Sequence, residues 1–294
     1  MKVLMILAAV LCLFVPQVYA QAPLTITTEP NAIVWIDEIR RGKTDESGKL
    51  VLTKVSRGRH SVRVRASGFK EATMPLAAGR RALTVKLVPT TDEAELLFQQ
   101  AEIAREKARD DAALQKAADL YREAIKLRPA FPAAHVGLAR ILLDLNEFKA
   151  AHAEIDAARR ARPSYPEASA VEGRIYREEA FDKDAMTSFR RAIREARGVQ
   201  PEAYVGMAKV YEDKGDFALA VNEYKRALAQ LSDSEPVIYQ MLGAAYERIE
   251  KPKEAVAAYE KYLQLAPNGS YAAAIRSILE QLKRESDGDN QIIP

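Results

Sequence analysis

Cysteine, histidine and long apolar runs are scarce in this chain of 294 residues. A single cysteine, Cys12, cannot form a disulfide framework, a cysteine-based zinc site or a haem attachment motif. No run of roughly 18 apolar residues follows residue 20, so the sequence predicts no integral membrane span beyond that point. Glycine-rich phosphate loops and dinucleotide-binding fingerprints are also absent, which excludes the common nucleotide-dependent enzymes.

Charge of one sign is not in excess either, because 44 Lys and Arg face 41 Asp and Glu, for a formal charge of +3. Such a balance does not point to a nucleic-acid binder. The sum nevertheless covers two unlike parts: residues 21–90 carry +7, residues 91–294 carry −5, and Lys2 supplies the rest. The sequence therefore predicts a basic head joined to an acidic body.

The first twenty residues have the three-part pattern of a secretory signal peptide. A cationic Met1-Lys2 start precedes the apolar run Val3–Val15, and Val18-Tyr19-Ala20 precedes the expected cleavage point. The run is shorter than the ~20 residues that cross a bilayer, so an uncleaved anchor is the less favoured alternative. Lipidation of Cys12 is not expected, because the residue before it is not small. We expect residues 1–20 to direct secretion across the inner membrane to the periplasm or cell envelope.

Residues 21–90 alternate apolar and polar side chains in several short runs, which Gly, Pro and Asn separate. The clearest runs are 24–27, 34–37, 61–65 and 83–87. Alternation with period two between turn residues predicts short antiparallel strands, and several such strands predict a small β-sandwich. The alternation ends at 89–92, where Thr or Asp can cap a helix.

From residue 92 onward the apolar period is that of a helix, and a pattern repeats. A small residue recurs in each expected first helix, at Ala101, Ala139, Gly173, Ala208 and Gly243. The last three steps are 34, 35 and 35 residues, and in the last four units an alanine follows 12 positions on. The first unit departs from this, since Ala117 follows Ala101 by 16 residues, which predicts a longer first hairpin. Hairpins with small residues at such positions pack closely and stack into a solenoid.

These positions resemble the tetratricopeptide repeat over residues 94–267. Five repeats are expected, starting near Ala94, Pro132, Pro166, Pro201 and Pro236. An amphipathic helix over 271–284 would cap the open end. The predicted fold class is α+β with two domains: a small antiparallel β-sandwich at 21–90 and an all-α solenoid of helical hairpins at 91–285, before a flexible tail at 286–294. The resemblance implies a protein-interaction scaffold.

Residues 23–88 resemble a PEGA domain, a small β-sandwich of bacterial and archaeal surface proteins. The order of Pro30, Gly58–Val64 and Gly68-Phe69 carries the resemblance, although the motif itself reads Pro-Asn-Ala-Ile here. The usual Asp-Gly turn after the second strand reads Asp37-Glu38, which leaves the geometry of that turn open. The resemblance implies a surface or envelope role and no catalytic activity.

A ladder of cations is predicted in the solenoid groove. In the tetratricopeptide fold the residue after the small one tends to face the concave surface, and here it is Arg140, Arg174 and Lys209 in three consecutive repeats. Arg177 lies one turn on from Arg174. Such a ladder could bind the carboxylates of an acidic or C-terminal peptide. Alternatively, acidic residues on the same helices, at Glu167, Glu178, Glu202, Glu212 and Asp213, neutralise it internally.

A second candidate is a basic patch of Arg57, Arg59, Arg63 and Arg65, which share one face at spacing two. It could bind an anionic envelope glycan, lipid head groups or an acidic protein, or it could simply be a charged solvent face. Nucleic acid is not expected, because these strands lack aromatic platforms. Trp35 alternates with Val34 and Ile36, and we favour a core position for its ring over an exposed contact.

Catalysis has little support. The only histidines are His60, His135 and His152, and we expect structural or solvated roles for them, with no catalytic residue, metal or cofactor. The leading hypothesis is a non-enzymatic adaptor of the cell envelope whose groove binds a protein segment. The alternative is a glycan- or surface-binding module that uses the solenoid as a spacer, and the least favoured is an enzyme that uses the histidines.

Overall fold

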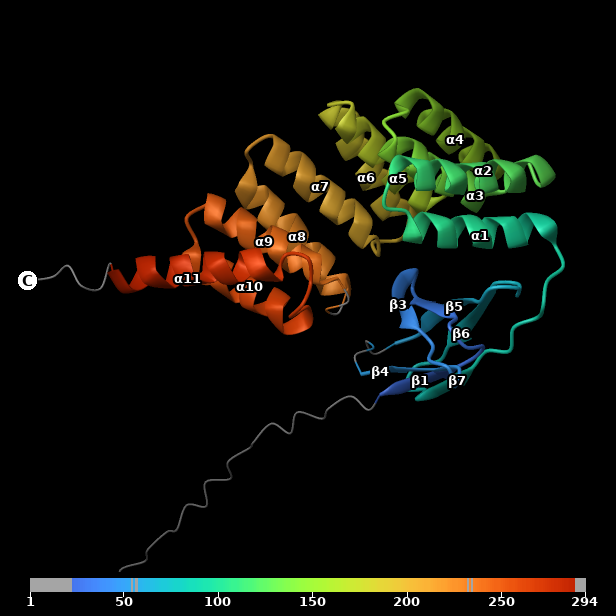
Figure 1. Cartoon of the computed structure of the whole chain (residues 1–294), viewed down its shortest axis with the longest axis horizontal. Helices are drawn as coiled ribbons and strands as arrows, with labels where there is room; N and C mark the ends of the chain where they lie inside the picture. Colours follow the sequence, from blue (N-terminus) through green and yellow to red (C-terminus); the bar gives the residue numbers. More distant parts are fainter. Residues whose placement is uncertain (1–22, 54, 56–57, 232, 234, 289–294) are drawn as a thin grey trace, which may run out of the picture.

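The computed structural model describes residues 23–53, 55, 58–231, 233 and 235–288. The expected signal peptide with Cys12, the patch candidate Arg57 and residues 289–294 of the expected tail lie outside the described residues. A small β-domain of two sheets is followed by a solenoid of helical hairpins (Figure 1), which confirms the predicted fold class. No described helix has the length and apolar character needed to cross a membrane.

The β-domain consists of a three-stranded and a four-stranded sheet. The first has the order β4 (Lys49–Leu52), β1 (Leu24–Thr27), β7 (Ala82–Thr84). The second has the order β3 (Ile39–Lys43), β2 (Ile33–Ile36), β5 (His60–Arg65), β6 (Ala72–Leu76). One pair departs from the antiparallel prediction: β7 runs parallel to β1, because the chain returns to the first sheet only after building the second.

Period-two alternation decides which side chains lie between the sheets. Ile26, Val34 and Val62 are fully buried there. The preferred core position of Trp35 is wrong, because its neighbours Val34 and Ile36 occupy the core face and turn its ring to the opposite face. There the ring is half-buried beneath two arginines instead of lying in the sandwich.

The turn between β2 and β3 has an unusual backbone. Asp37 (φ 50°) and Glu38 (φ 64°) are both left-handed, a conformation that favours glycine and is found in two-residue hairpin turns. Side chains hold the turn in place. Asp37 accepts a hydrogen bond from the Ser61 N–H (2.9 Å), and Glu38 pairs with Arg63 (2.8 Å).

Ten helices in the described chain form five hairpins. The pairs are α1 (Glu93–Lys107) with α2 (Asp111–Leu127), α3 (Pro132–Asp144) with α4 (Phe148–Ala161), α5 (Pro166–Glu178) with α6 (Asp182–Glu195), α7 (Pro201–Asp213) with α8 (Phe217–Leu231), and α9 (Pro236–Arg248) with α10 (Pro252–Leu265). Proline opens four of the first helices, where its missing N–H is not needed. The first hairpin is longer, as predicted, with helices of 15 and 17 residues.

A last helix, α11 (Ala272–Gly288), packs against α10 and buries Ile275 and Leu279. It continues past residue 285, so the first residues of the expected flexible tail are helical.

Glycine and aromatic residues interlock between hairpins as the repeat predicts. A Cβ on Gly173 of α5 would lie 2.6 Å from the ring of Phe189, and one on Gly206 of α7 would lie 2.2 Å from the same ring. Phe189 of α6 therefore fills the space between its own hairpin and the next. Close contact of this kind fixes the angle between successive hairpins and gives the solenoid its concave face.

Candidate functional site: a cleft between the two domains

The β-domain packs against the concave side of the solenoid and contacts it at two separate places (Figure 1). The first contact is with α1. Gln99 of α1 accepts a hydrogen bond from the Gly68 N–H (2.9 Å) and donates one to the Phe69 carbonyl (2.8 Å). Gln99 is buried, so these bonds replace water on both partners and fix α1 to the loop after β5.

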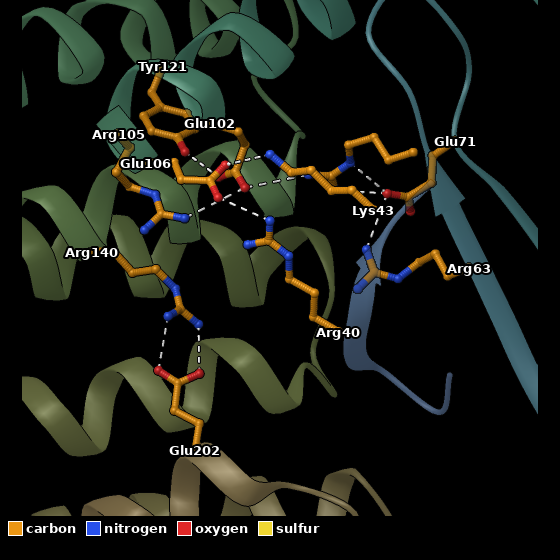
Figure 2. Close-up of polar contacts among 11 residues, drawn as sticks. Arg40, Lys43, Arg63, Glu71, Glu102, Arg105, Glu106, Tyr121, Arg140 and Glu202 are labelled. Carbon is orange, nitrogen blue, oxygen red and sulfur yellow. Dashed lines mark hydrogen bonds and ion pairs between the residues drawn. The ribbon is translucent and has the colours of Figure 1, made fainter. Parts of the chain in front are cut away.

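Ion pairs extend the α1 contact. Arg40 and Lys43 of β3 reach Glu106 of α1 at 3.0 and 3.5 Å (Figure 2). Arg65 of β5 lies 3.5 Å from Glu102, which also accepts a hydrogen bond from the Tyr121 hydroxyl. Although burial opposes it, the cations around Glu102 lower the pKa of this carboxyl.

The second contact lies far along the chain, where α8 ends and α9 begins. Ile39 of β3 is only 6% exposed, and it belongs to the same buried apolar cluster as Leu231 and Ile238 of the solenoid. Arg41 donates a hydrogen bond to the Leu231 carbonyl (3.3 Å). The β2–β3 hairpin therefore crosses the concave face from the first repeat to the junction of the fourth and fifth.

Between these contacts lies a cleft of about 1030 Å³. Trp35, Glu38 and Ile39 line it from the hairpin. The first helices of the second to fifth repeats line it from the solenoid. All four candidates of the cation ladder face this one cleft: Arg140, Arg174, Arg177 and Lys209.

Neighbouring carboxylates neutralise part of the ladder. Arg140 of α3 makes a bidentate pair with Glu202 of α7, at 3.0 and 2.9 Å (Figure 2). Burial alone would lower the pKa of Arg140, but the Glu202 carboxylate outweighs it and raises this pKa. Arg177 is held by Asp213 and Glu178, each at 2.7 Å. These two arginines therefore tie first helices together and offer less charge to a ligand.

Arg174 and Lys209 remain more available. Arg174 keeps 37% of its side chain exposed and reaches Asp144 and Glu202 only at 3.5 and 3.7 Å. Lys209 of α7 is half-buried, and no carboxylate of the described chain lies within 4.0 Å of its ammonium. Burial first, and then Arg177 and Arg174, lower the pKa of Lys209. An anion in the cleft would relieve this repulsion.

Two arginines of the predicted basic patch, Arg63 and Arg65, are engaged by other groups of the β-domain. Arg63 and Arg65 do share a face, but both guanidinium groups lie over Trp35, at 4.1 and 5.4 Å from the ring centroid. Both also pair with Glu71, at 3.2 and 2.8 Å. Arg59 precedes β5 and is exposed.

Each histidine has a carboxylate partner, and the three lie in different elements. His60 pairs with Asp37 (2.6 Å), His135 with Glu154 (2.6 Å), and His152 with Glu179 (2.8 Å). The second nitrogen of His135 lies 2.9 Å from the Pro129 carbonyl; burial opposes protonation, but these acceptors raise its pKa. No three acidic, His or Cys side chains of the described residues are grouped to hold a metal ion.

Sequence reasoning missed the surface on α1 that receives the β-domain. Gln99, Glu102 and Glu106 all lie on α1, at spacings of three and four residues that place them on one helix face. The available signal was the charge division, because a basic domain directly before an acidic helix predicts attraction between them.

Comparisons with known proteins find tetratricopeptide repeat matches within the solenoid. Two tetratricopeptide repeat models match residues 108–175 and 199–268. Among solved structures, a thermophilic tetratricopeptide repeat protein of Thermus thermophilus is 21% identical, with TM-score 0.55, over 64% of this chain and 98% of that one. PilF of Pseudomonas aeruginosa is 15% identical, with TM-score 0.55, over 67% of this chain and 86% of that one.

A tetratricopeptide repeat protein of Parabacteroides merdae is 18% identical, with TM-score 0.50, over 66% of this chain and 73% of that one. At these identities the likeness shows the fold. No curated protein matches the sequence significantly.

Proposed function

We propose that this protein is a non-enzymatic adaptor of the bacterial cell envelope that binds a protein segment in the cleft. Tetratricopeptide repeats are generally non-catalytic scaffolds for protein interactions, which makes binding the natural use of the concave face. The observation that carries the proposal is Lys209, a half-buried cation with no carboxylate of the described residues within 4.0 Å, beside Arg174 and Arg177 in one cleft.

The chemistry of the cleft favours an extended segment with a carboxylate. A carboxylate seated between Arg174 and Lys209 would form charge-assisted hydrogen bonds to both. The cleft walls add apolar contact from Val205, Val237 and Met241, which line it near the α9 side. A ligand that uses both the cations and the apolar side chains would be a short stretch of a partner protein with acidic and apolar residues.

A binding experiment tests this proposal with a defined probe. The chain from residue 21 onward would be screened against a library of synthetic acidic dodecapeptides, with the emission of Trp35 as the signal, since it is the only tryptophan and lines the cleft. We expect Lys209→Glu and Arg174→Glu each to weaken the best peptide roughly tenfold or more, the equivalent of one lost charge-assisted bond. Arg190→Glu, an exposed change on α6, serves as the control. Equal affinity in all four proteins would refute the groove assignment.

The envelope location is part of the proposal. It is supported by the signal-peptide pattern of residues 1–20 and by the resemblance of residues 23–88 to a PEGA domain. Amino-terminal sequencing of the protein recovered from a periplasmic fraction should begin at Gln21. A chain that begins at Met1 and stays in the cytosol would contradict the location.

A second candidate, binding of an anionic envelope glycan or lipid by the β-domain, rests on the exposed Arg59, Arg80 and Arg81 and on the charge of +7. The pairing of Arg63 and Arg65 with Glu71 opposes it. Co-sedimentation with purified peptidoglycan at low salt, lost at high salt, would support this candidate.

A further inference from the structure

Strand β3 lies in the solenoid groove as a bound peptide would. It is the edge strand of its sheet, paired on one side only with β2. Its own side chains supply the contacts to the solenoid: Ile39 enters the apolar cluster, Arg41 reaches the Leu231 carbonyl, and Arg40 and Lys43 reach Glu106. An extended edge segment that inserts its side chains into a groove is a common mode of peptide recognition.

These contacts define the chemistry of the place that β3 occupies on the solenoid, which we call the seat. One position takes a branched aliphatic side chain, because Ile39 is buried beside Leu231 and Ile238. The next two take basic side chains, because a carboxylate and a carbonyl oxygen accept from Arg40 and Arg41. The seat thus fits an extended aliphatic-basic-basic stretch and differs from the cationic part of the cleft around Lys209.

The connection before β3 carries strain. Asp37 and Glu38 adopt left-handed backbone conformations, which are unfavourable for residues other than glycine. Persistence of such a turn requires the surroundings to hold it. The bonds that hold this turn come from Ser61 and Arg63 of the β-domain itself, so the hairpin can leave the groove as a unit without losing its shape.

We propose that β3 is a resident ligand of the solenoid and that a partner segment of the same chemistry, one aliphatic residue followed by two basic ones, takes its seat when the β-domain moves away. The inference rests on the proposed function, since it assumes that the concave face binds protein segments. The solenoid would then bind two kinds of segment, an acidic one near Lys209 and an aliphatic-basic-basic one in the seat. The second kind could bind only after the β-domain has left the groove.

The test uses the chain from residue 21 onward and a labelled synthetic peptide with the sequence of residues 36–43, IDEIRRGK. Ile39→Asp in the protein should vacate the seat, and small-angle scattering should show an increased radius of gyration. Fluorescence anisotropy should then show that the peptide binds this variant roughly tenfold more tightly than it binds the wild type. The same peptide with Asp in place of Ile39 should bind neither protein.

If Ile39→Asp does not fold by circular dichroism, the double variant Arg40→Glu, Arg41→Glu replaces it, because neither side chain is buried and the two hold β3 to the solenoid at its two ends, Arg40 through Glu106 and Arg41 through the Leu231 carbonyl. Equal peptide affinity for the opened variant and the wild type would overturn the proposal. Lys209→Glu in the opened variant separates the two ideas: it should leave this basic peptide bound at least as tightly while weakening the acidic probe. If Lys209→Glu does not weaken binding of the acidic probe, while the basic peptide still binds the opened variant more tightly than the wild type, the result counts against the proposed function alone.

Discussion

The two contacts between the β-domain and the solenoid differ in both chemistry and distance along the chain. At α1 the contact is polar, with buried Gln99, the Glu102 network and the pairs of Glu106, and it lies close to the covalent connection. At the α8–α9 junction the described residues contribute the apolar side chain of Ile39 and a hydrogen bond between residues 190 apart. We therefore expect the second contact to open before the first, and we call the first contact the hinge and the second the latch.

The largest effect is expected from a change at the latch. Ile39→Asp loses about 1.5–3 kcal/mol of apolar burial and would place a carboxylate in an apolar cluster, so β3 should leave the groove while the Gln99 and Glu102 contacts of the hinge stay closed. Small-angle scattering should show a larger radius of gyration. Val51→Asp is the matched control, an aliphatic residue of the same domain that is 56% exposed, and it should leave the scattering unchanged.

A smaller effect is expected at the buried part of the hinge. Glu102→Gln removes the charge that faces Arg65 and Arg105 and accepts from Tyr121, so we expect a loss of about 1–3 kcal/mol in the free energy of unfolding. Urea denaturation followed by circular dichroism measures it. A loss as small as that of an exposed carboxylate would show that the network contributes little to the hinge.

The pH dependence should separate the two contacts. The pKa of Glu102 is lowered in the folded protein, so its contribution to stability is present above the ordinary value near 4.5 and is lost as the pH falls through the lowered pKa. At the latch, burial raises the pKa of Glu235 at the start of α9, so protonation of this carboxyl favours the folded protein as the pH falls. Hydrogen exchange at decreasing pH, corrected for intrinsic rates, should therefore show α1 losing protection before α9. Simultaneous loss would contradict the distinction.

The smallest effect is expected from Glu106, whose side chain is 45% exposed. Glu106→Gln removes the pairs with Arg40 and Lys43, which at such exposure contribute at most about 1 kcal/mol. Thermal unfolding at low salt should show a small decrease in Tm that vanishes at about 1 M salt, where charges are screened beyond about 3 Å. A decrease that persists at high salt would mean that Glu106 acts through packing.

The repeats could be predicted from the sequence because each hairpin is defined by local spacing. Gly173, Ala208 and Gly243 recur at nearly constant intervals, and their neighbours fill the gaps they leave. Strands β1, β2 and β5 were equally visible, because one face of each is buried and the alternation is regular.

Other features could not be predicted, for physical reasons. Strand β3 reads Ile-Arg-Arg-Gly-Lys, without alternation, because its side chains contact the solenoid and not the core between the sheets. The error over Trp35 has a different cause, because its ring is covered by Arg63 and Arg65 of the neighbouring strand β5 within the β-domain. Spacing placed the ladder residues on one face, but which of them are neutralised depends on Glu202 and Asp213 of the fourth repeat, and spacing alone does not give those distances.

The central claim is that the β-domain closes the groove of its own solenoid. The chain from residue 21 onward has no cysteine, so spin labels can be placed only at two introduced cysteines, Val51→Cys on β4 and Glu254→Cys on α10, both at exposed positions. Pulsed electron paramagnetic resonance then measures the distance between the domains. We predict a single narrow distribution that broadens and lengthens with Ile39→Asp. A wild-type distribution as broad as that of the variant would contradict the claim.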